Sequence, residues 1–231
     1  MTALETLVGQ RLGSLGGNSI AAAAFTGGVA AGSPSYGFTS KGTAPQTLLL
    51  RATDSDGASS AGYTEASMPL RSGRLRLSNA FGSARAALQL PALAEYWSGN
   101  AWVLNSADNC TLLAAGSVLL SNPRTPSGTA STATSSASGI TLASGSGLIT
   151  LSAPTPSGSS LTLDLAINLG SSASDQSCNA SHPASTGAAK PWLRSLNGSC
   201  AASADRDPAA RASFGVYSAE SRKTVHGREI F

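Results

Sequence analysis

The sequence predicts an all-β protein, an antiparallel β-sandwich of immunoglobulin-like or jelly-roll-like type with long Ser/Gly-rich loops. Short apolar or alternating segments recur at roughly even spacing, separated by turns rich in Gly, Pro, Asn and Ser. No convincing internal helix interrupts the series, a pattern typical of sandwiches and barrels. Charged residues make up 12% of the chain, about half of the usual share, which suits an exported β protein with a hydroxyl-rich surface.

Residues 1–35 are predicted to form an irregular or weakly helical, poorly ordered N-terminal segment. Within 1–15, the apolar residues Leu4, Leu7 and Val8 lie at helical spacing. Two Gly-Gly pairs further along then break the regularity.

Residues 36–70 are predicted to contain two strands joined by a turn. The run QTLLLRA at 46–52 is short and apolar, as in a buried strand, and 62–70 is the second candidate. Between them lies TDSDG at 53–57, where Asp side chains can bond their own main chain and Gly supplies a positive φ.

The clearest strand signals lie in residues 71–231. The run RLRLSN at 74–79 alternates apolar and polar side chains, the signature of a half-buried strand, and 87–93 continues in the same style. Aromatic residues then flank a Ser-Gly-Asn turn, which predicts a hairpin with Trp97 and Trp102 packed across its two strands.

The rest of the chain repeats short apolar runs between turns and loops. A stretch dominated by Ser, Thr, Ala, Gly and Pro at 123–139 is predicted to be a long exposed loop. A second loop-rich region runs from 170 to 207, in which the Pro-Trp-Leu run at 191–193 is expected to be an apolar anchor. Further strands are expected at 112–120, 140–142, 147–153, 160–169, 212–217 and 224–231.

Charge and hydropathy argue against two classes of partner. The net charge is +3, but the basic residues are scattered singly, and no Lys/Arg cluster interleaved with aromatics exists to follow a phosphate backbone. No run of about 20 apolar residues could span a membrane. No signal peptide is evident, so export is expected to depend on a signal upstream in a longer gene product.

The three cysteines, Cys110, Cys178 and Cys200, form no C-x-x-C pair, so a zinc site is poorly supported. In an exported protein, Cys178 and Cys200 could close a modest loop and contribute about 3 kcal/mol by the chain-entropy model. Cys110 paired with either of the others, or three free thiols, are the alternatives that the sequence leaves open.

Several segments resemble one family in the same order along the chain. The carrying segments are GRLRLSNAFGS at 73–83, LAEYWSGNAWVLNSADNCT at 93–111, PWLR at 191–194, DRDPAARASFGVY at 205–217 and HGREIF at 226–231. Residues 71–231 thereby resemble the C-terminal β domain of MshQ-like proteins of mannose-sensitive haemagglutinin (MSHA) biogenesis. The segment at 36–57 is similar to what precedes that domain, which implies that 36–70 is the end of an immunoglobulin-like module or its linker strands.

The resemblance implies a large exported protein associated with a type IV pilus locus. It implies a surface or pilus-linked role in adhesion or assembly, and it supplies no catalytic residue. Other pilus or cell-envelope proteins, or surface glycans, are the partners that it suggests.

Candidate catalytic groups are few. A serine hydrolase needs a base beside its nucleophile, and the only histidines are His182, in a polar loop, and His226, in a terminal strand. No G-x-S-x-G run lies between a strand and a helix. We therefore expect no catalytic residues, with a hydrolase as the least favoured alternative.

Two pairs of aspartates could suggest glycosidase or calcium chemistry. These are Asp54 with Asp56, and Asp205 with Asp207. Turn-stabilising hydrogen bonds explain both pairs better, because an EF-hand loop counted from Asp54 would need Gly where Ser59 stands. No cofactor is expected, and calcium is the alternative.

Arg206 and Arg211 bracket the pair Asp205 and Asp207 and are expected to form ion pairs with it. Asp207 is also expected to accept hydrogen bonds from nearby amides.

The function expected from the sequence is that of a non-catalytic structural or interaction domain at the cell surface. The alternative from another class is a carbohydrate-binding module in which Tyr96, Trp97 and Trp102 stack on sugar rings. Packing of these aromatics within their hairpin is the favoured interpretation, and an open indole face would be needed for binding.

Overall fold

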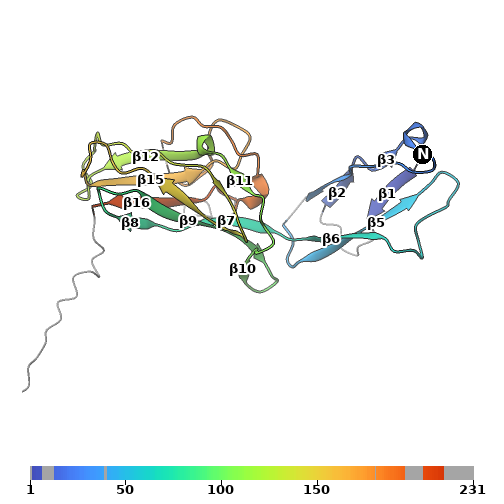
Figure 1. Cartoon of the computed structure of the whole chain (residues 1–231). Coiled ribbons are helices and arrows are strands. Elements are labelled where there is room, and N and C mark those ends of the chain that lie inside the picture. Colours follow the sequence, from blue (N-terminus) through green and yellow to red (C-terminus); the bar gives the residue numbers. More distant parts are fainter. Residues whose placement is uncertain (1, 7–12, 39–40, 180, 196–204, 216–231) are drawn as a thin grey trace, which may run out of the picture. The chain divides into compact units, whose positions relative to one another are not determined.

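The computed structural model describes residues 2–6, 13–38, 41–179, 181–195 and 205–215. In this part the chain consists of strands and three short 3-10 turns (Figure 1), which confirms the all-β prediction. The chain divides into two compact units. The N-terminal unit is Met1–Ser72 with Tyr96–Val103, and the C-terminal unit is Gly73–Glu95 with Leu104–Phe231.

The N-terminal unit contains a four-stranded antiparallel sheet in the order β3-β1-β5-β6. Its strands are β1 (Thr2–Thr6), β3 (Ser19–Ile20), β5 (Gln46–Thr53) and β6 (Ala66–Leu70), and a separate pair is formed by β2 (Gly13–Gly16) and β4 (Ser35–Phe38). The helix expected at the start of the chain is wrong for Thr2–Thr6, because these residues pair with β5. Pairing with a strand more than 40 residues away overrides the weak helical spacing.

The N-terminal unit buries little apolar surface. Between residues 13 and 72, Leu48 on β5 is the one hydrophobic side chain of the described residues that is fully buried. Met68 on β6 and Tyr63 before it are exposed. The free energy from apolar burial in this unit is therefore small.

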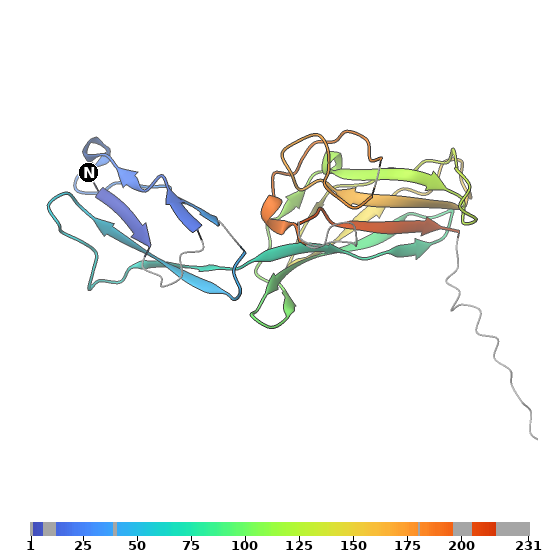
Figure 2. The ribbon, with the colours of Figure 1, turned by 180° about the vertical axis from the view of Figure 1, so that it is seen from behind.

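The C-terminal unit is a β-sandwich, seen from two sides in Figures 1 and 2. One sheet is formed by β7, β9 and β14, and the other has the order β12-β15-β16-β8. All described pairs in the second sheet are antiparallel except β16 with β8, which is parallel. The strands are β7 (Gly73–Leu77), β8 (Ala80–Gly82), β9 (Leu88–Trp97), β12 (Val118–Arg124), β14 (Ser146–Leu151), β15 (Leu161–Ile167) and β16 (Ala209–Phe214). Strand β10 (Trp102–Leu104), of which only Leu104 belongs to this unit, pairs with β9.

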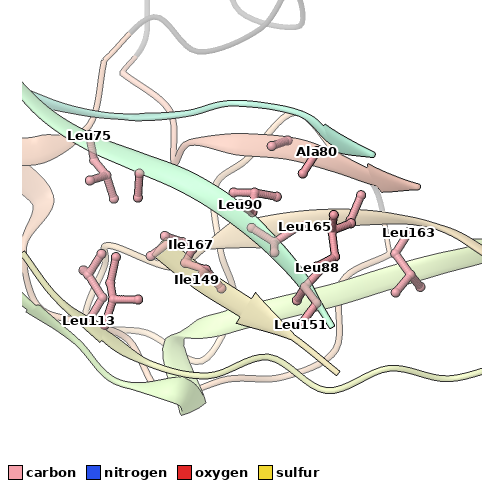
Figure 3. Close-up of a cluster of buried hydrophobic side chains, with 14 of the residues drawn as sticks. Leu75, Ala80, Leu88, Leu90, Leu113, Ile149, Leu151, Leu163, Leu165 and Ile167 are labelled. Carbon is pink, nitrogen blue, oxygen red and sulfur yellow. The ribbon is translucent and has the colours of Figure 1, made fainter. Parts of the chain in front are cut away.

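The core lies between the two sheets (Figure 3). Leu88 and Leu90 on β9 and Ile149 on β14 point toward Leu163 and Leu165 on β15 (Figure 3). The strand predicted at 160–169 is confirmed as β15, and its residues Leu161, Leu163, Leu165 and Ile167 are all buried in this cluster. Strand β15 is central in its sheet and is buried on both faces.

Two expected elements differ from the structure. The strand expected at 112–120 is broken into β11 (Leu112–Leu113), a 3-10 turn (Ala115–Ser117) and the start of β12. The segment 123–139 is mostly exposed and forms no regular strand after Arg124, as predicted, but it is bonded along the edge of β14 and beyond it. Ser138 N donates to Thr150 O at 2.9 Å, and Thr134 and Thr155 exchange two backbone bonds. Covering this edge removes a row of unpaired backbone groups.

The remaining strand predictions meet the structure in part. The strand expected at 212–217 is β16, which begins earlier, at Ala209. The last expected strand, 224–231, lies outside the described residues. None of the helices in the described part of the chain has the length and apolar character that crossing a membrane requires.

Candidate functional site

A single charged residue lies in the middle of the most buried strand of the sandwich. Asp164 lies between Leu163 and Leu165 on β15, and since those two face the core, Asp164 faces the outer side of the sheet. It is nevertheless buried. In register beside it lie Ser121 on β12 and Arg211 on β16.

The Asp164 carboxylate accepts three side-chain hydrogen bonds. Its Oδ1 accepts one from Arg124 Nη2 at 2.6 Å and one from Arg211 Nε at 3.2 Å. Its Oδ2 accepts one from Asn122 Nδ2 at 3.1 Å. The register of β12 shifts between Ser121 and Arg124, and Asn122 has a positive φ of 51°. This bulge is what brings both Asn122 and Arg124 to one carboxylate.

These contacts determine the charge state of Asp164. Burial favours its neutral form, but the hydrogen bonds from Arg124 and Asn122, the positive charge of Arg124 and the bond from Arg211 outweigh it. The net result is that the pKa of Asp164 lies below its ordinary value of 3.8. The carboxylate is therefore ionised at neutral pH and occupied by its partners, so it is poorly suited to act as a general base.

A cavity of about 400 Å³ opens beside this carboxylate. We call it the Asp164 pocket, and its lining residues are Asn79, Asp164, Cys178, Asn179, Ala209, Ala210 and Arg211. Three parts of the chain build it: the residue before β8, the strands β15 and β16, and the loop that follows β15.

Polar groups of the Asp164 pocket remain open to a ligand. The Arg211 side chain is 56% exposed. Of its three guanidinium nitrogens, only Nε has a hydrogen-bond partner among the described residues. Asn79 Oδ1 accepts a bond from Arg211 N at 2.8 Å, which leaves its amide nitrogen open. The Asn179 side chain has no hydrogen-bond partner among the described residues, although its backbone N–H donates to Ser177 Oγ. The site thus offers a guanidinium edge and two amides, which are groups that bind acceptor oxygens and hydroxyls.

The family model described as DUF6701, fourth domain, matches residues 71–230. The chain belongs to this family. No curated protein and no solved structure matches the chain. The matched region of the DUF6701 fourth domain includes the whole Asp164 pocket.

Outside this pocket, the aromatic residues singled out from the sequence gather at the predicted hairpin of the DUF6701 domain. The hairpin of β9 and β10 is confirmed, with Gly99 at a φ of 110°. Trp97 and Trp102 lie edge to face with ring centroids 5.6 Å apart, and the Arg71 guanidinium lies over the Tyr96 ring at 4.4 Å. All three rings are half-buried and engaged with one another or with Arg71.

Trp192 behaves differently from the prediction. The expected apolar anchor at 191–193 is a 3-10 turn in which Leu193 is buried, while Trp192 is 60% exposed. Leu193 packs close to Gly73, where an added Cβ would lie 3.2 Å from its Cδ2. The anchor is therefore Leu193 alone.

The cysteines and histidines are only partly described. Cys178 is disulfide-bonded and Cys110 is an exposed free thiol. Cys200, the expected partner of Cys178, lies outside the described residues, as does His226. Both ring nitrogens of His182 are buried without a hydrogen-bond partner, so His182 bonds to no serine or carboxylate in the described part.

The two aspartate pairs have separate structural roles. Asp54 Oδ1 accepts the backbone N–H groups of Asp56 and Ala58 at 2.9 and 2.8 Å, which confirms the turn interpretation. Asp207 is fully buried, whereas Asp205 is exposed. No group of three or more His, Cys, Asp or Glu side chains is arranged to hold a metal among the residues that the structure describes.

The ion pairs expected for Asp207 and for Arg211 are wrong in their partners. Asp207 pairs with Arg194 through Nε at 2.6 Å and Nη2 at 3.1 Å, and Arg211 pairs with Asp164 instead. The expectation that Asp207 accepts amide bonds is confirmed, but the donors are Leu169 N and Gln176 N, far away in the sequence.

Sequence reasoning missed the Asp164 pocket. The available signal was one carboxylate within the otherwise apolar run LTLDLAI of β15, since a buried charge requires partners. The partners of Asp164 lie 40 to 47 residues away in the sequence, and Asn79 lies 132 residues from Arg211. Strand pairing and the bulge in β12 bring them together.

Proposed function

We propose that this chain is a non-catalytic interaction module of an exported, surface-located protein, which binds its partner through the Asp164 pocket. The observation that carries the proposal is that the Asp164 carboxylate is occupied by its partners while neighbouring polar groups are not. The carboxylate accepts bonds from Arg124, Arg211 and Asn122. The terminal nitrogens of Arg211 and the side-chain amide nitrogens of Asn79 and Asn179 have no hydrogen-bond partner among the described residues. Such a site suits recognition better than acid–base chemistry.

Export is supported by the chemistry of the cysteines. Disulfides persist in oxidising compartments and are rare in cytosolic proteins. Cys178, which lines the Asp164 pocket, is disulfide-bonded. The low share of charged residues agrees with export.

The resemblance of residues 71–231 to MshQ-like C-terminal domains extends the proposal. We propose that the exported protein is linked to a type IV pilus of the MSHA kind, with a role in adhesion or pilus assembly. Other pilus components, cell-envelope proteins or surface glycans are the partners considered.

Binding of the purified chain to envelope material tests the proposal. The chain is immobilised, and washed envelope fractions of the source cells are passed over it, with Arg211→Gln as the site variant. Arg85→Gln is the matched control, because Arg85 is exposed in the same unit and does not line the pocket. We expect retention that Arg211→Gln reduces and Arg85→Gln leaves unchanged.

Two results would contradict the proposal. One is envelope binding that is equal in all three proteins, or none at all. The other is turnover of ester, peptide or glycoside substrates that His182→Ala abolishes.

The location at the cell surface has its own test. A membrane-impermeant amine reagent should label the protein on intact cells, and labelling only after lysis would contradict surface exposure.

A further inference from the structure

The open groups of the Asp164 pocket point to a particular ligand chemistry. We infer that this pocket binds an acidic sugar unit, a uronic acid of a surface polysaccharide, through its carboxylate and ring hydroxyls. The inference rests on the proposed function and names the ligand class of the same site.

The charge around the pocket matches one carboxylate. Asp164 carries one negative charge, and Arg124 and Arg211, both bonded to it, carry one positive charge each. One positive charge therefore remains in excess beside the cavity. Because Arg211 uses Nε for Asp164, the edge formed by its two terminal nitrogens stays available. That edge can donate two parallel hydrogen bonds to a carboxylate.

The Asp164 bond also prepares Arg211 for this role. An exposed arginine samples many rotamers, and holding it in one conformation costs conformational entropy on binding. Here Nε is held by Asp164 and the backbone N–H of Arg211 is held by Asn79 Oδ1. The guanidinium is thereby oriented before the ligand arrives.

The two asparagines favour a hydroxylated ligand over a simple carboxylate. In the described part of the chain, neither the Asn79 amide nitrogen nor the Asn179 side-chain amide, which can both donate and accept, has a hydrogen-bond partner. Ring hydroxyls both donate and accept, so they match such groups. A carboxylate without hydroxyl groups would occupy Arg211 but bring no ring hydroxyls to the asparagines.

The size of the pocket agrees with a small ligand. Its volume of about 400 Å³ lies in the lower part of the range of about 300–1,000 Å³ that is usual for small-molecule sites. That space suits one or two sugar rings.

Titration calorimetry of the whole chain with trigalacturonate tests the inference. The matched ligand is the fully methyl-esterified trigalacturonate, which keeps the rings and removes the charge, and a Gly-Glu-Gly peptide represents protein carboxylates. We expect trigalacturonate to bind at least about tenfold more tightly than its ester or the peptide, because a hydrogen bond to a charged group contributes about a factor of ten or more.

Two variants separate recognition from folding. Arg211→Gln should weaken trigalacturonate binding by about tenfold or more, with Arg85→Gln unchanged. Asn179→Ala removes an amide with no partner in the described chain, so the fold should be retained while binding weakens by about three- to tenfold. Equal binding of acid and ester, preference for the peptide, or no effect of either variant would overturn the inference.

Failure of the inference and failure of the proposed function give different results. If trigalacturonate does not bind but envelope fractions are retained in an Arg211-dependent way, the uronic acid is wrong and the interaction module stands. If neither binds, both are wrong.

Discussion

Replacing Arg194 by methionine should destabilise the C-terminal unit strongly, because it leaves the buried charge of Asp207 without its arginine partner. Asp207 is fully buried and accepts four hydrogen bonds, two from Arg194 and two from the backbone N–H groups of Leu169 and Gln176. The Arg194 side chain is only 13% exposed. Gly170 makes room for it, since an added Cβ there would lie 2.6 Å from Arg194 Nη2.

The magnitude follows from what Arg194→Met leaves behind. Removing one partner of a buried ion pair costs about 3–5 kcal/mol, because the other charge remains desolvated. The two amide bonds to Asp207 survive, so we expect the lower end, about 3 kcal/mol. For a domain of this size that corresponds to a fall in melting temperature of about 6–12 °C.

The assay is thermal and urea unfolding of the whole chain, followed by far-UV circular dichroism. Arg76→Met is the matched control, because Arg76 is 44% exposed and its partner Glu95 keeps a second arginine, Arg74. We expect the control to cost under about 1 kcal/mol. If the two variants lose similar stability, or if Arg194→Met loses none, the ion pair with Asp207 does not hold this part of the unit.

Three further predictions address the site, a turn and the two units. The free energy of unfolding should fall as the pH drops below about 4, because a carboxyl with a lowered folded-state pKa, such as Asp164, loses its stabilising contribution as it is protonated. Asp164→Asn should make the free energy of unfolding depend less on pH in this range, and an unchanged dependence would contradict the role of Asp164. Gly145→Ala should lower the free energy of unfolding by about 2 kcal/mol or more, because the φ of Gly145 is +75° and an added Cβ would lie 2.5 Å from Asn105 O. Gly128→Ala, at a positive φ but with open space around it, should lower it less, and equal losses of stability in denaturant titration would contradict the clash. In hydrogen exchange, amides of β15, buried throughout, should exchange far more slowly than those of the exposed β6, and similar rates would mean that burial does not set their protection.

Local patterns in the sequence predicted most strands of the sandwich. Side chains alternate across a strand with a period of two, so the leucines of β15 and of β7 reveal their core face without knowledge of any neighbour. The Asp54 turn and the Gly99 hairpin were predictable for the same reason, since their hydrogen bonds and φ angles involve residues a few positions apart.

The start of the chain was mispredicted because its conformation depends on a distant partner. The spacing of Leu4 and Leu7 is compatible with one turn of helix, but β1 is held as a strand by its pairing with β5. The break between β11 and β12 likewise follows from different partners, since β11 pairs with β13 (Ile140–Thr141) and β12 with β15.

The sequence by itself determined that this chain folds as strands and tight turns, since periodicity and turn chemistry act over a few residues. Only the tertiary structure decided where a charge is buried and what surrounds it. Asp164 acquires Arg211 because β16 places the two residues in register, and it acquires Arg124 because the register of β12 shifts after Ser121. Asn179, from the loop after β15, lines the same pocket as Asp164. Such contacts depend on which strands become neighbours, and pairing between distant segments is not encoded in the spacing of any one of them.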